Sequence, residues 1–553
     1  MEKQSSKQNW KVWLPLLISV TLVFGILLGM RLPSSQPAIR IIQQDDLKSN
    51  TLGSGKVEEL IRYIEAKYVD PVDREKLLND AIASIMDDLD PHSNYYSASD
   101  AIGVKESLEG KFDGIGIEFM IIDDTIMVLN ALEDGPSWEV GIRSGDKMIA
   151  IQDSLVAGVG ITSDQIMDRL RGEKGTTVDV QVLDAETHKI VDYTVTRDRI
   201  PSSSVETAIM LDDKTGFIKL SRFTAQTYEE FMQGLENLVE NHQMENLIVD
   251  LRQNPGGYLQ ETTQILSQLF NENDRLLVYT EGRTSPRKDF ETTGRPFFNV
   301  GRMVVLIDEG SASASEILAG AVQDNDRGVL VGRRSFGKGL VQERYTLSDG
   351  SEIHLTVARY YTPSGRSIQK SYSDKSEYIQ DVAERYLHGE MLDRDSIKIL
   401  DSTEYFTLSG RPVYGGGGIV PDVFVPIDTL MLSETYLLLR QQIPAFVFRY
   451  LEGEGAQFTD MSEESFIHNY RISETLFQQF MSFAAAKIDR FVPNEDDIHR
   501  AGGYLKQDLL ARMGHQLYGP DAFYAISNAH DPDVQTALQL IGRPEAQWRA
   551  SIE

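Results

Sequence analysis

The pattern of apolar and polar residues divides the chain into regions of different kinds. Two runs, at 57–70 and 77–90, repeat apolar side chains at helical spacing, and the second ends just before a proline, which stops a helix. Residues 105–198 instead carry short alternating runs broken by glycine, which is typical of β-strands. The sequence therefore predicts a helical region at 56–104, followed by a compact α+β module.

The next region, 199–430, alternates continuous apolar strands with helix-like runs. Two of its strands, at 246–252 and 303–309, end in turns that lead directly into helices. Open α/β sheets usually build their sites at the carboxyl ends of strands, so these two turns are candidate site elements. The remaining residues, 431–553, carry broad apolar faces at helical spacing and predict a helical C-terminal region.

One apolar segment is long enough to cross a bilayer. Residues 12–30 contain no charge, and as a helix they would span about 28 Å. Three lysines precede the segment and only Arg31 follows closely, so we expect residues 1–11 in the cytoplasm and residues 31–55 as an external tether. The alternative is a cleaved signal peptide, but the run is longer than a signal core and lacks a small-x-small cleavage site after it. We expect an uncleaved anchor.

Composition and charge remove several classes of function. The fractions of hydrophobic (41%) and charged (25%) residues are those of a globular protein, and a net charge of -30 opposes binding to nucleic acid. The chain has no cysteine, which excludes thiolate chemistry and cysteine-ligated zinc. The nine histidines form no HExxH pair and no serine lies in G-x-S-x-G, so we expect no metal and no other cofactor. His92 and His354 are interpreted as structural residues.

A glycine-rich turn opens the α+β module. Successive amides in the sequence FDGIGIEF at 112–119 can form a concave anion site for a terminal carboxylate, and the following strand can pair with a peptide. The alternative is that the two glycines only permit a tight turn. Together with EDGPSWEVGIRSGDKMIAIQD at 133–153, this turn resembles that of PDZ domains. The resemblance assigns carboxylate binding to Gly114, Ile115, Gly116 and Ile117.

A serine cluster and a lysine carry the candidate chemistry. Ser311, Ser313 and Ser315 surround the second helix start, where a serine is normally only a cap. Lys338 lies between two glycines, and Gln342 follows at a spacing that shares its face on a strand or a helix. Ser/Lys catalysis requires a neutral amine, so the lysine pKa must fall from about 10.4 toward 7, which burial can achieve. A neutral glutamine amide can orient such an amine without restoring its charge.

These residues lie within motifs that closely resemble the C-terminal processing (tail-specific) serine protease family. The motifs are LRQNPGG at 251–257, GSASASEILAGAVQD at 310–324, RRSFGKGLVQ at 333–342, YYTPSGRSI at 360–368 and GGGGIVPDV at 415–423. One departure is Gln253, where many relatives carry asparagine, and we expect it to alter the turn only slightly. The resemblance assigns the nucleophile to Ser313, the general base to Lys338, the residue orienting that base to Gln342, and the oxyanion hole to the Gly257 and Ala314 amides.

The resemblance also implies the architecture and the partners. It implies a multidomain α+β chain with a ββα core similar to crotonase and Clp protease, an inserted PDZ domain, helical terminal regions and one transmembrane helix. Such an endopeptidase would bind apolar or unstructured C-terminal tails of exported proteins, from the inner membrane of a Gram-negative-type envelope with its catalytic part in the periplasm. The family often oligomerises through terminal helices, so a homo-oligomer is expected.

Two other readings remain. A catalytically silent, membrane-tethered PDZ scaffold would retain the fold, but it has no use for the Ser313, Lys338 and Gln342 set. An acyl-CoA enzyme on a crotonase-like core lacks a CoA-binding feature and leaves the PDZ module without a purpose.

Overall fold

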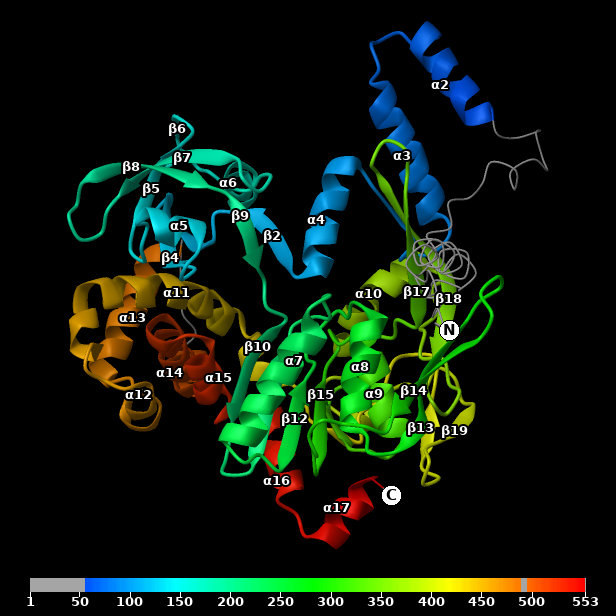
Figure 1. The fold of residues 1–553 in the computed structure, drawn as a ribbon. Coiled ribbons are helices and arrows are strands. Elements are labelled where there is room, and N and C mark those ends of the chain that lie inside the picture. The colour runs from blue at the N-terminus through cyan, green and yellow to red at the C-terminus, as the bar shows by residue number, and fades with distance from the viewer. Residues whose placement is uncertain (1–54, 489–494, 553) are drawn as a thin grey trace, which may run out of the picture. The chain divides into compact units, whose positions relative to one another are not determined.

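The structure is a computed structural model that describes residues 55–488 and 495–552 (Figure 1). The predicted anchor at 12–30 lies outside the described residues. Within them, no helix combines the length and the apolarity that a membrane span requires. The chain divides into two compact units, 1–78 and 79–553.

The first unit contains helix α2 (Lys56–Lys67) and the start of α3 (Arg74–Asp87), in the region where helices were predicted. Arg74 joins the two helices through ion pairs of 2.8 Å with Glu58 and with Glu65. All three side chains are exposed, and such pairs stabilise a fold by less than about 1 kcal/mol each.

A six-stranded sheet forms the centre of the second unit. The four pairings between neighbouring strands from β11 to β21 are parallel, and β10 pairs with β11 in antiparallel orientation at one edge. Strands of this kind are buried on both faces and read as continuous apolar runs, as the sequence indicated. In spatial order the strands are β10 (Val205–Met210), β11 (Thr215–Leu220), β12 (Asn246–Asp250), β15 (Met303–Ile307), β16 (Val329–Gly332) and β21 (Val423–Phe424).

Helices cover both faces of this sheet (Figure 1). Successive strand residues point to opposite faces, so Leu247 and Val249 face one layer while Ile248 faces the other. The first layer is made by α7 (Thr227–Glu236), α8 (Leu259–Leu269) and α9 (Ala314–Asp324), and the second by α16 (Pro532–Ile541) and α17 (Glu545–Ile552). The last helices of the C-terminal region are therefore part of the core that holds the central sheet.

A second sheet lies beside the first helical layer and carries part of the candidate site. Its order is β1-β18-β13-β14, and β17 pairs with β18. His354 lies on β18 opposite Asn94, so its interpretation as a sheet residue is confirmed. The strands are β1 (Asn94–Tyr96), β13 (Asn273–Glu281), β14 (Lys288–Thr293), β17 (Leu340–Thr346) and β18 (Glu352–Tyr361).

The predicted α+β module has its own sheet and its own apolar core. Strand β2 (Lys111–Gly114) pairs with β9 (Asp198–Pro201), which brings the two ends of the module together. Between them lie helix α6 (Ser163–Leu170) and a sheet of the order β3-β4-β5-β7-β8, with β3 at one edge. Its strands are β3 (Ile117–Ile122), β4 (Thr125–Ala131), β5 (Lys147–Ile151), β7 (Thr177–Leu183) and β8 (Ile190–Thr196).

The C-terminal region is helical, as predicted, and most of it packs around a separate apolar core. The helices of that core are α11 (Glu434–Glu454), α12 (Glu463–Asn469), α13 (Glu474–Lys487), α14 (Glu495–Tyr518) and α15 (Pro520–Asn528). Taken together, the sheets and helices of the second unit make a mixed α/β fold.

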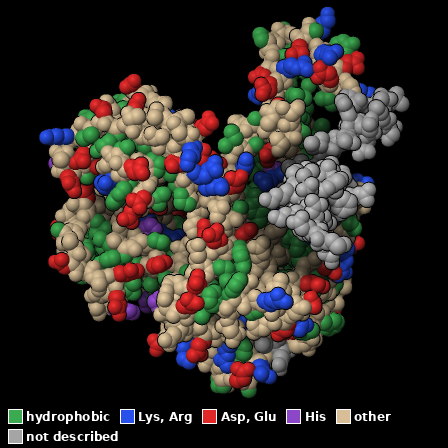
Figure 2. Space-filling view, in the orientation of Figure 1, with side chains coloured by type: hydrophobic (Ala, Val, Ile, Leu, Met, Phe, Trp, Pro, Cys, Tyr) green, Lys and Arg blue, Asp and Glu red, His purple; other side chains and the backbone are tan. Residues whose placement is uncertain are grey.

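Charged side chains of both signs are interspersed over the face that Figure 2 shows. In the second unit, exposed ion pairs include Lys214–Glu245 at 2.7 Å and Arg287–Asp289 at 2.6 Å. Because solvent screens these pairs, they serve as reference sites for judging the buried ion pairs of the core.

Candidate active site

The two predicted turns at the ends of β12 and β15 meet. A Cβ atom at Gly256 would lie 2.7 Å from the Cβ of Ser313 and 2.8 Å from the amide nitrogen of Ala314, so only glycine permits this approach. The amide of Ala312 also donates to the carbonyl of Asn254 at 3.0 Å. The fold therefore places the NPGG loop directly against the serine cluster, as the parallel strand ends indicated.

The three clustered serines have different surroundings. The hydroxyl of Ser311 donates to the Leu251 carbonyl at 2.8 Å, and that of Ser315 donates to the Asn254 carbonyl at 2.9 Å; both residues are buried. Ser313 is only half-buried; its side chain faces the Glu316 amide in a capping box, and its hydroxyl donates to no other described residue. Ser311 and Ser315 thus hold the two turns together, while the hydroxyl of Ser313 is available for chemistry.

The backbone of Ser313 adopts a strained conformation. Its φ of +56° is in the left-handed region, which costs a residue with a side chain on the order of 1–3 kcal/mol. Glu316 stabilises it from the next turn of α9, because the Ser313 amide donates to Glu316 Oε2 at 2.9 Å and the Glu316 amide donates to the Ser313 carbonyl at 2.9 Å. The strained turn presents the serine at the start of a buried helix.

Lys338 lies in the loop between β16 and β17, where the side chains of Glu316 and Tyr360 bind its backbone. Its amide donates to Glu316 Oε2 at 2.8 Å. The hydroxyl of Tyr360, on β18, donates to the Lys338 carbonyl at 2.6 Å and lies 3.0 Å from the Ser313 carbonyl. The backbones of the serine and the lysine are therefore fixed to each other through one carboxylate and one phenol.

The environment of Lys338 favours its neutral form. Burial lowers the pKa of Lys338 from its ordinary value of 10.5, and the negative charges of Glu316 and Asp90 oppose that shift only in part. No hydrogen bond joins the Lys338 amine to Ser313 or Gln342 among the residues that the structure describes. Such bonds are often long in a free enzyme and tighten when substrate binds.

The remaining predicted site residues lie around this pair. Gln342 lies on β17, and its side-chain amide nitrogen is 3.5 Å from the hydroxyl of Thr356 on β18. The amides of Gly257 and Ala314 donate to no other described residue, so both remain available as oxyanion donors. Gln253 donates from its amide and its side chain to Asp308 at 2.9 and 2.7 Å, which shows how the turn accommodates glutamine.

Glu316 was not identified from the sequence, although it binds amides in both the Ser313 and the Lys338 loops. Besides the two amides already named, its Oε1 accepts from the Ser335 hydroxyl at 2.6 Å and from the Gly337 amide at 2.7 Å. Burial raises the pKa of Glu316 to about 7, and these four donors oppose the rise. The capping-box spacing of Ser313 and Glu316 at a helix start is the sequence signal that would have identified it.

Replacing Glu316 with glutamine is expected to weaken both stability and catalysis. The new amide group cannot accept from an N–H, so two of the four donors lose their partner at a cost of about 2 to 4 kcal/mol in total. The link through Glu316 between the serine and lysine loops is then weakened, which leaves Tyr360 as the intact link, and kcat should fall at least tenfold. Urea denaturation and reporter cleavage, measured on the same preparation, check this. An unchanged kcat in a destabilised variant would show that Glu316 serves the fold alone.

The predicted carboxylate-binding residues lie in the α+β module, apart from this cluster in the chain. Gly114 ends β2, Gly116 has a φ of +70°, and Ile117 begins β3. The N–H groups of Ile115 and Gly116 donate to no other described residue, and β3 pairs only with β4 (Thr125–Ala131). A turn with free amides therefore adjoins an open strand edge.

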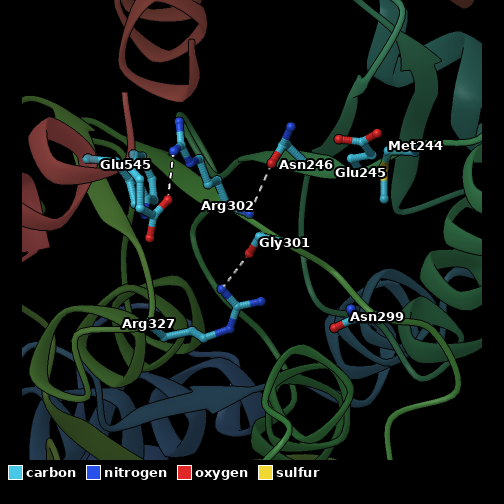
Figure 3. A pocket seen from close by; sticks show the side chains of 9 residues that line it. Met244, Glu245, Asn246, Asn299, Gly301, Arg302, Arg327 and Glu545 are labelled. Carbon is cyan, nitrogen blue, oxygen red and sulfur yellow. Dashed lines mark hydrogen bonds and ion pairs between the residues drawn. The ribbon is translucent and has the colours of Figure 1, made fainter. Parts of the chain in front are cut away.

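A different cavity, of about 500 Å³, lies at the amino ends of β12 and β15, the opposite end from the catalytic loops (Figure 3). Its two arginines already have partners: Arg302 binds Glu545 at 2.8 Å, and Arg327 donates to the Gly301 carbonyl at 2.9 Å. These bonds fix α17 and the loop before β15, so we assign the cavity a structural role.

Comparison with known proteins identifies the family of this chain. The sequence model of peptidase family S41 matches residues 214–375, and that of a family of unknown function matches residues 435–519. Carboxy-terminal processing protease CtpB of Bacillus subtilis is 33% identical over 351 residues, which cover 62% of this chain and 71% of that protein. A carboxy-terminal-processing protease of Bartonella bacilliformis is 30% identical over 400 residues, which cover 70% of this chain and 89% of that protein.

Among solved structures, the photosystem II D1 C-terminal processing protease matches 72% of this chain and 97% of its own, with a TM-score of 0.35 and 24% identity. The sequence relatives alone are close enough, and cover enough of their own length, to decide the family. The chain belongs to peptidase family S41 and is a member of its carboxy-terminal processing serine proteases.

Proposed function

We propose that this protease hydrolyses peptide bonds with Ser313 as nucleophile and Lys338 as general base. The observation that carries the proposal is the shared support of the two residues: both amides bind one Glu316 oxygen, while the serine hydroxyl stays uncommitted and burial lowers the pKa of the lysine. A partly buried amine and an uncommitted hydroxyl, with backbones held by one carboxylate, are groups that nucleophilic catalysis can use.

The reaction follows from these positions. The Ser313 oxygen attacks the peptide carbonyl carbon while the neutral Lys338 amine accepts the hydroxyl proton. The amides of Gly257 and Ala314 stabilise the resulting oxyanion, each by about 3 to 4 kcal/mol. The C–N bond then breaks, and the lysine ammonium returns its proton to the leaving amine. Water, deprotonated by the same amine, then attacks the acyl carbon. The bond from that carbon to the Ser313 oxygen breaks, the lysine ammonium returns its proton to the serine, and the acyl group leaves as a carboxylic acid.

The module at 105–198 is proposed to bind substrate tails as a PDZ domain does. Its support is the open edge of β3 next to the free amides of Ile115 and Gly116, which suits an added peptide strand that ends in a carboxylate. With residues 12–30 as a single membrane anchor, the substrates are exported proteins with apolar or unstructured C-termini in the periplasm. A homo-oligomer is likewise proposed only from the family resemblance.

The test is cleavage of an unfolded reporter by the full-length chain in detergent. The reporter ends in an apolar tail, and a matched reporter ends in two aspartates. Wild type should cut the first faster, and Ser313→Ala should cut neither. Binding of the tail without cleavage would replace the protease with the silent scaffold, and equal cleavage of both reporters would remove the tail-binding role while leaving the protease.

Replacing Gly116 with alanine is expected to raise KM for the tailed reporter about tenfold, the equivalent of about 1.4 kcal/mol, without changing kcat. The glycine has a φ of +70°, and an added Cβ would lie 3.1 Å from Ile200, so the carboxylate turn must shift. Gly158→Ala is the matched control, because its φ is +72° and its Cβ would meet nothing within 4 Å. An equal rise in KM for both variants would contradict a role specific to this turn.

A further inference from the structure

The surroundings of Asp90 are not explained by its place just before Pro91, the proline that stops the predicted helix. It is buried in the turn between α3 and β1, and its carboxylate accepts from four donors within the second unit. These are the amides of His92 (2.8 Å) and Ser93 (2.9 Å) and the hydroxyls of Ser93 (2.6 Å) and Thr356 (3.2 Å). The hydrogen bonds lower the pKa of Asp90 although burial opposes them, so the group is an ionised acceptor at neutral pH.

Thr356 connects this carboxylate to Gln342, the predicted partner of the proposed base. It lies on β18 opposite Gln342 of β17, and the two side chains approach within 3.5 Å. The turn also holds the backbone of Thr356, because its amide donates to the Ser93 hydroxyl at 3.1 Å. Thr356 is therefore fixed at two atoms by a segment more than 260 residues earlier in the chain.

The chemistry of the donors sets the direction of this chain of bonds. A carboxylate only accepts, so the Thr356 hydroxyl proton must point toward Asp90. The hydroxyl oxygen is then an acceptor on its other side, and it takes the NH₂ group of Gln342 rather than the carbonyl. The Gln342 carbonyl oxygen is left as the acceptor for an N–H of the Lys338 amine.

That direction matters for catalysis. A neutral amine has two N–H donors and one lone pair, and the lone pair must receive the Ser313 proton. A glutamine carbonyl binds an N–H and leaves the lone pair free, whereas a flipped amide would donate to the lone pair and block it.

We infer that Asp90 is a positioning residue of the active site, which acts through Thr356 to hold the Gln342 carbonyl toward the Lys338 amine. The inference rests on the proposed Ser313–Lys338 mechanism. It gives a role to the turn that joins the N-terminal helices to the second sheet.

The test compares Asp90→Asn, Thr356→Val and Thr356→Ser in the full-length protein with the unfolded reporter. Asparagine can donate to the Thr356 hydroxyl and reverse the chain of bonds, and valine interrupts it without a change of shape. Both should lower kcat about 10- to 100-fold with KM within about twofold of wild type, since a misplaced group costs on this order. Thr356→Ser keeps the hydroxyl and should retain activity. Asp88→Asn, an exposed neighbour, is the matched control.

The pH profile separates positioning from simple loss of structure. The groups that interact with the Lys338 charge are Glu316, Asp90, His92 and His354. His92 stays neutral in the assay range, because burial and the lysine charge lower its pKa to about 4. In Asp90→Asn the pKa that governs the rise of activity with pH should be lower than in wild type, because a negative charge near the amine is lost. In Thr356→Val that pKa should stay and only the plateau should fall.

Wild-type kcat in Thr356→Val, or equal losses in the valine and serine variants, would overturn the positioning role. If Asp90→Asn does not fold, the two Thr356 variants decide alone. If Ser313→Ala retains activity, the proposed mechanism fails and this inference fails with it. Inactive Ser313→Ala beside fully active Asp90→Asn and Thr356→Val overturns only the role of Asp90.

Discussion

Replacing Lys338 with methionine is expected to lower kcat by about 10³- to 10⁴-fold, the upper range for loss of a general base, while KM changes little. Methionine keeps the unbranched shape of the lysine but cannot accept the Ser313 proton. Wild-type activity should increase with pH as the amine loses its proton, at a pH below 10.5 because burial lowers the pKa of Lys338. The residual activity of the variant should not follow that titration.

The same substitution is expected to stabilise the folded protein at neutral pH. The lysine has a lower pKa in the folded chain than in the unfolded chain, so the unfolded state binds more protons between those two values. At pH values below the pKa of Lys338 in the folded chain, this difference lowers the stability of wild type by its full amount. The effect disappears as the pH rises toward 10.5. Lys338→Met should therefore melt a few degrees higher at pH 7, with a smaller advantage at pH 10.

Thermal melts at several pH values test the predicted stability, and reporter kinetics test the predicted loss of kcat. Lys105→Met is the control, since its side chain is 60% exposed and its replacement should leave Tm and kcat unchanged. More than a tenth of wild-type kcat in Lys338→Met would remove the lysine from the mechanism. A loss of stability at pH 7 would show that the amine is better solvated than its burial indicates.

The strand pattern predicted where the site lies, but not which serine serves it. Apolar strands followed by helix starts placed residues 251–257 and 310–315 at one edge of a parallel sheet, and the fold brings them into contact. The local sequence pattern does not distinguish Ser311, Ser313 and Ser315, because each could cap the helix. Their difference arises from hydrogen bonds to the neighbouring strand end, which only the folded sheet creates.

The residues that the sequence did not reveal act over long separations in the chain. Tyr360 binds carbonyls in both catalytic loops, and Asp90 reaches Thr356 across the sheet. Asp90 has only the local pattern of a helix end, and Tyr360, although it begins the motif at 360–368, has only that of an aromatic residue in a strand. Long-range pairing of this kind depends on sheet register, which the periodicity of a single strand does not specify. The anchor at 12–30 and the tail-binding role stay predictions.

Replacing Asp324 with alanine is expected to destabilise the protein by about 3 to 5 kcal/mol. Asp324 ends α9, and its carboxylate binds Arg366 at 2.7 Å; both side chains are almost completely buried. Without the carboxylate, the guanidinium keeps only the Gln323 side chain and the Tyr414 carbonyl as partners. A buried charge would remain with no opposite charge beside it.

Urea denaturation at pH 7 measures the loss, and Asp289→Ala is the matched control. Asp289 also pairs with an arginine, but in solvent, so its replacement should cost less than about 1 kcal/mol. Equal losses in the two variants would contradict the buried pair. The site should respond as well, because α9 begins next to Ser313 and Asp324 ties its far end to the turn that follows β18, the strand of Tyr360. Without this hydrogen bond, α9 and β18 are held less firmly. Both elements support the serine and lysine loops, so kcat should fall even under conditions in which the variant remains folded.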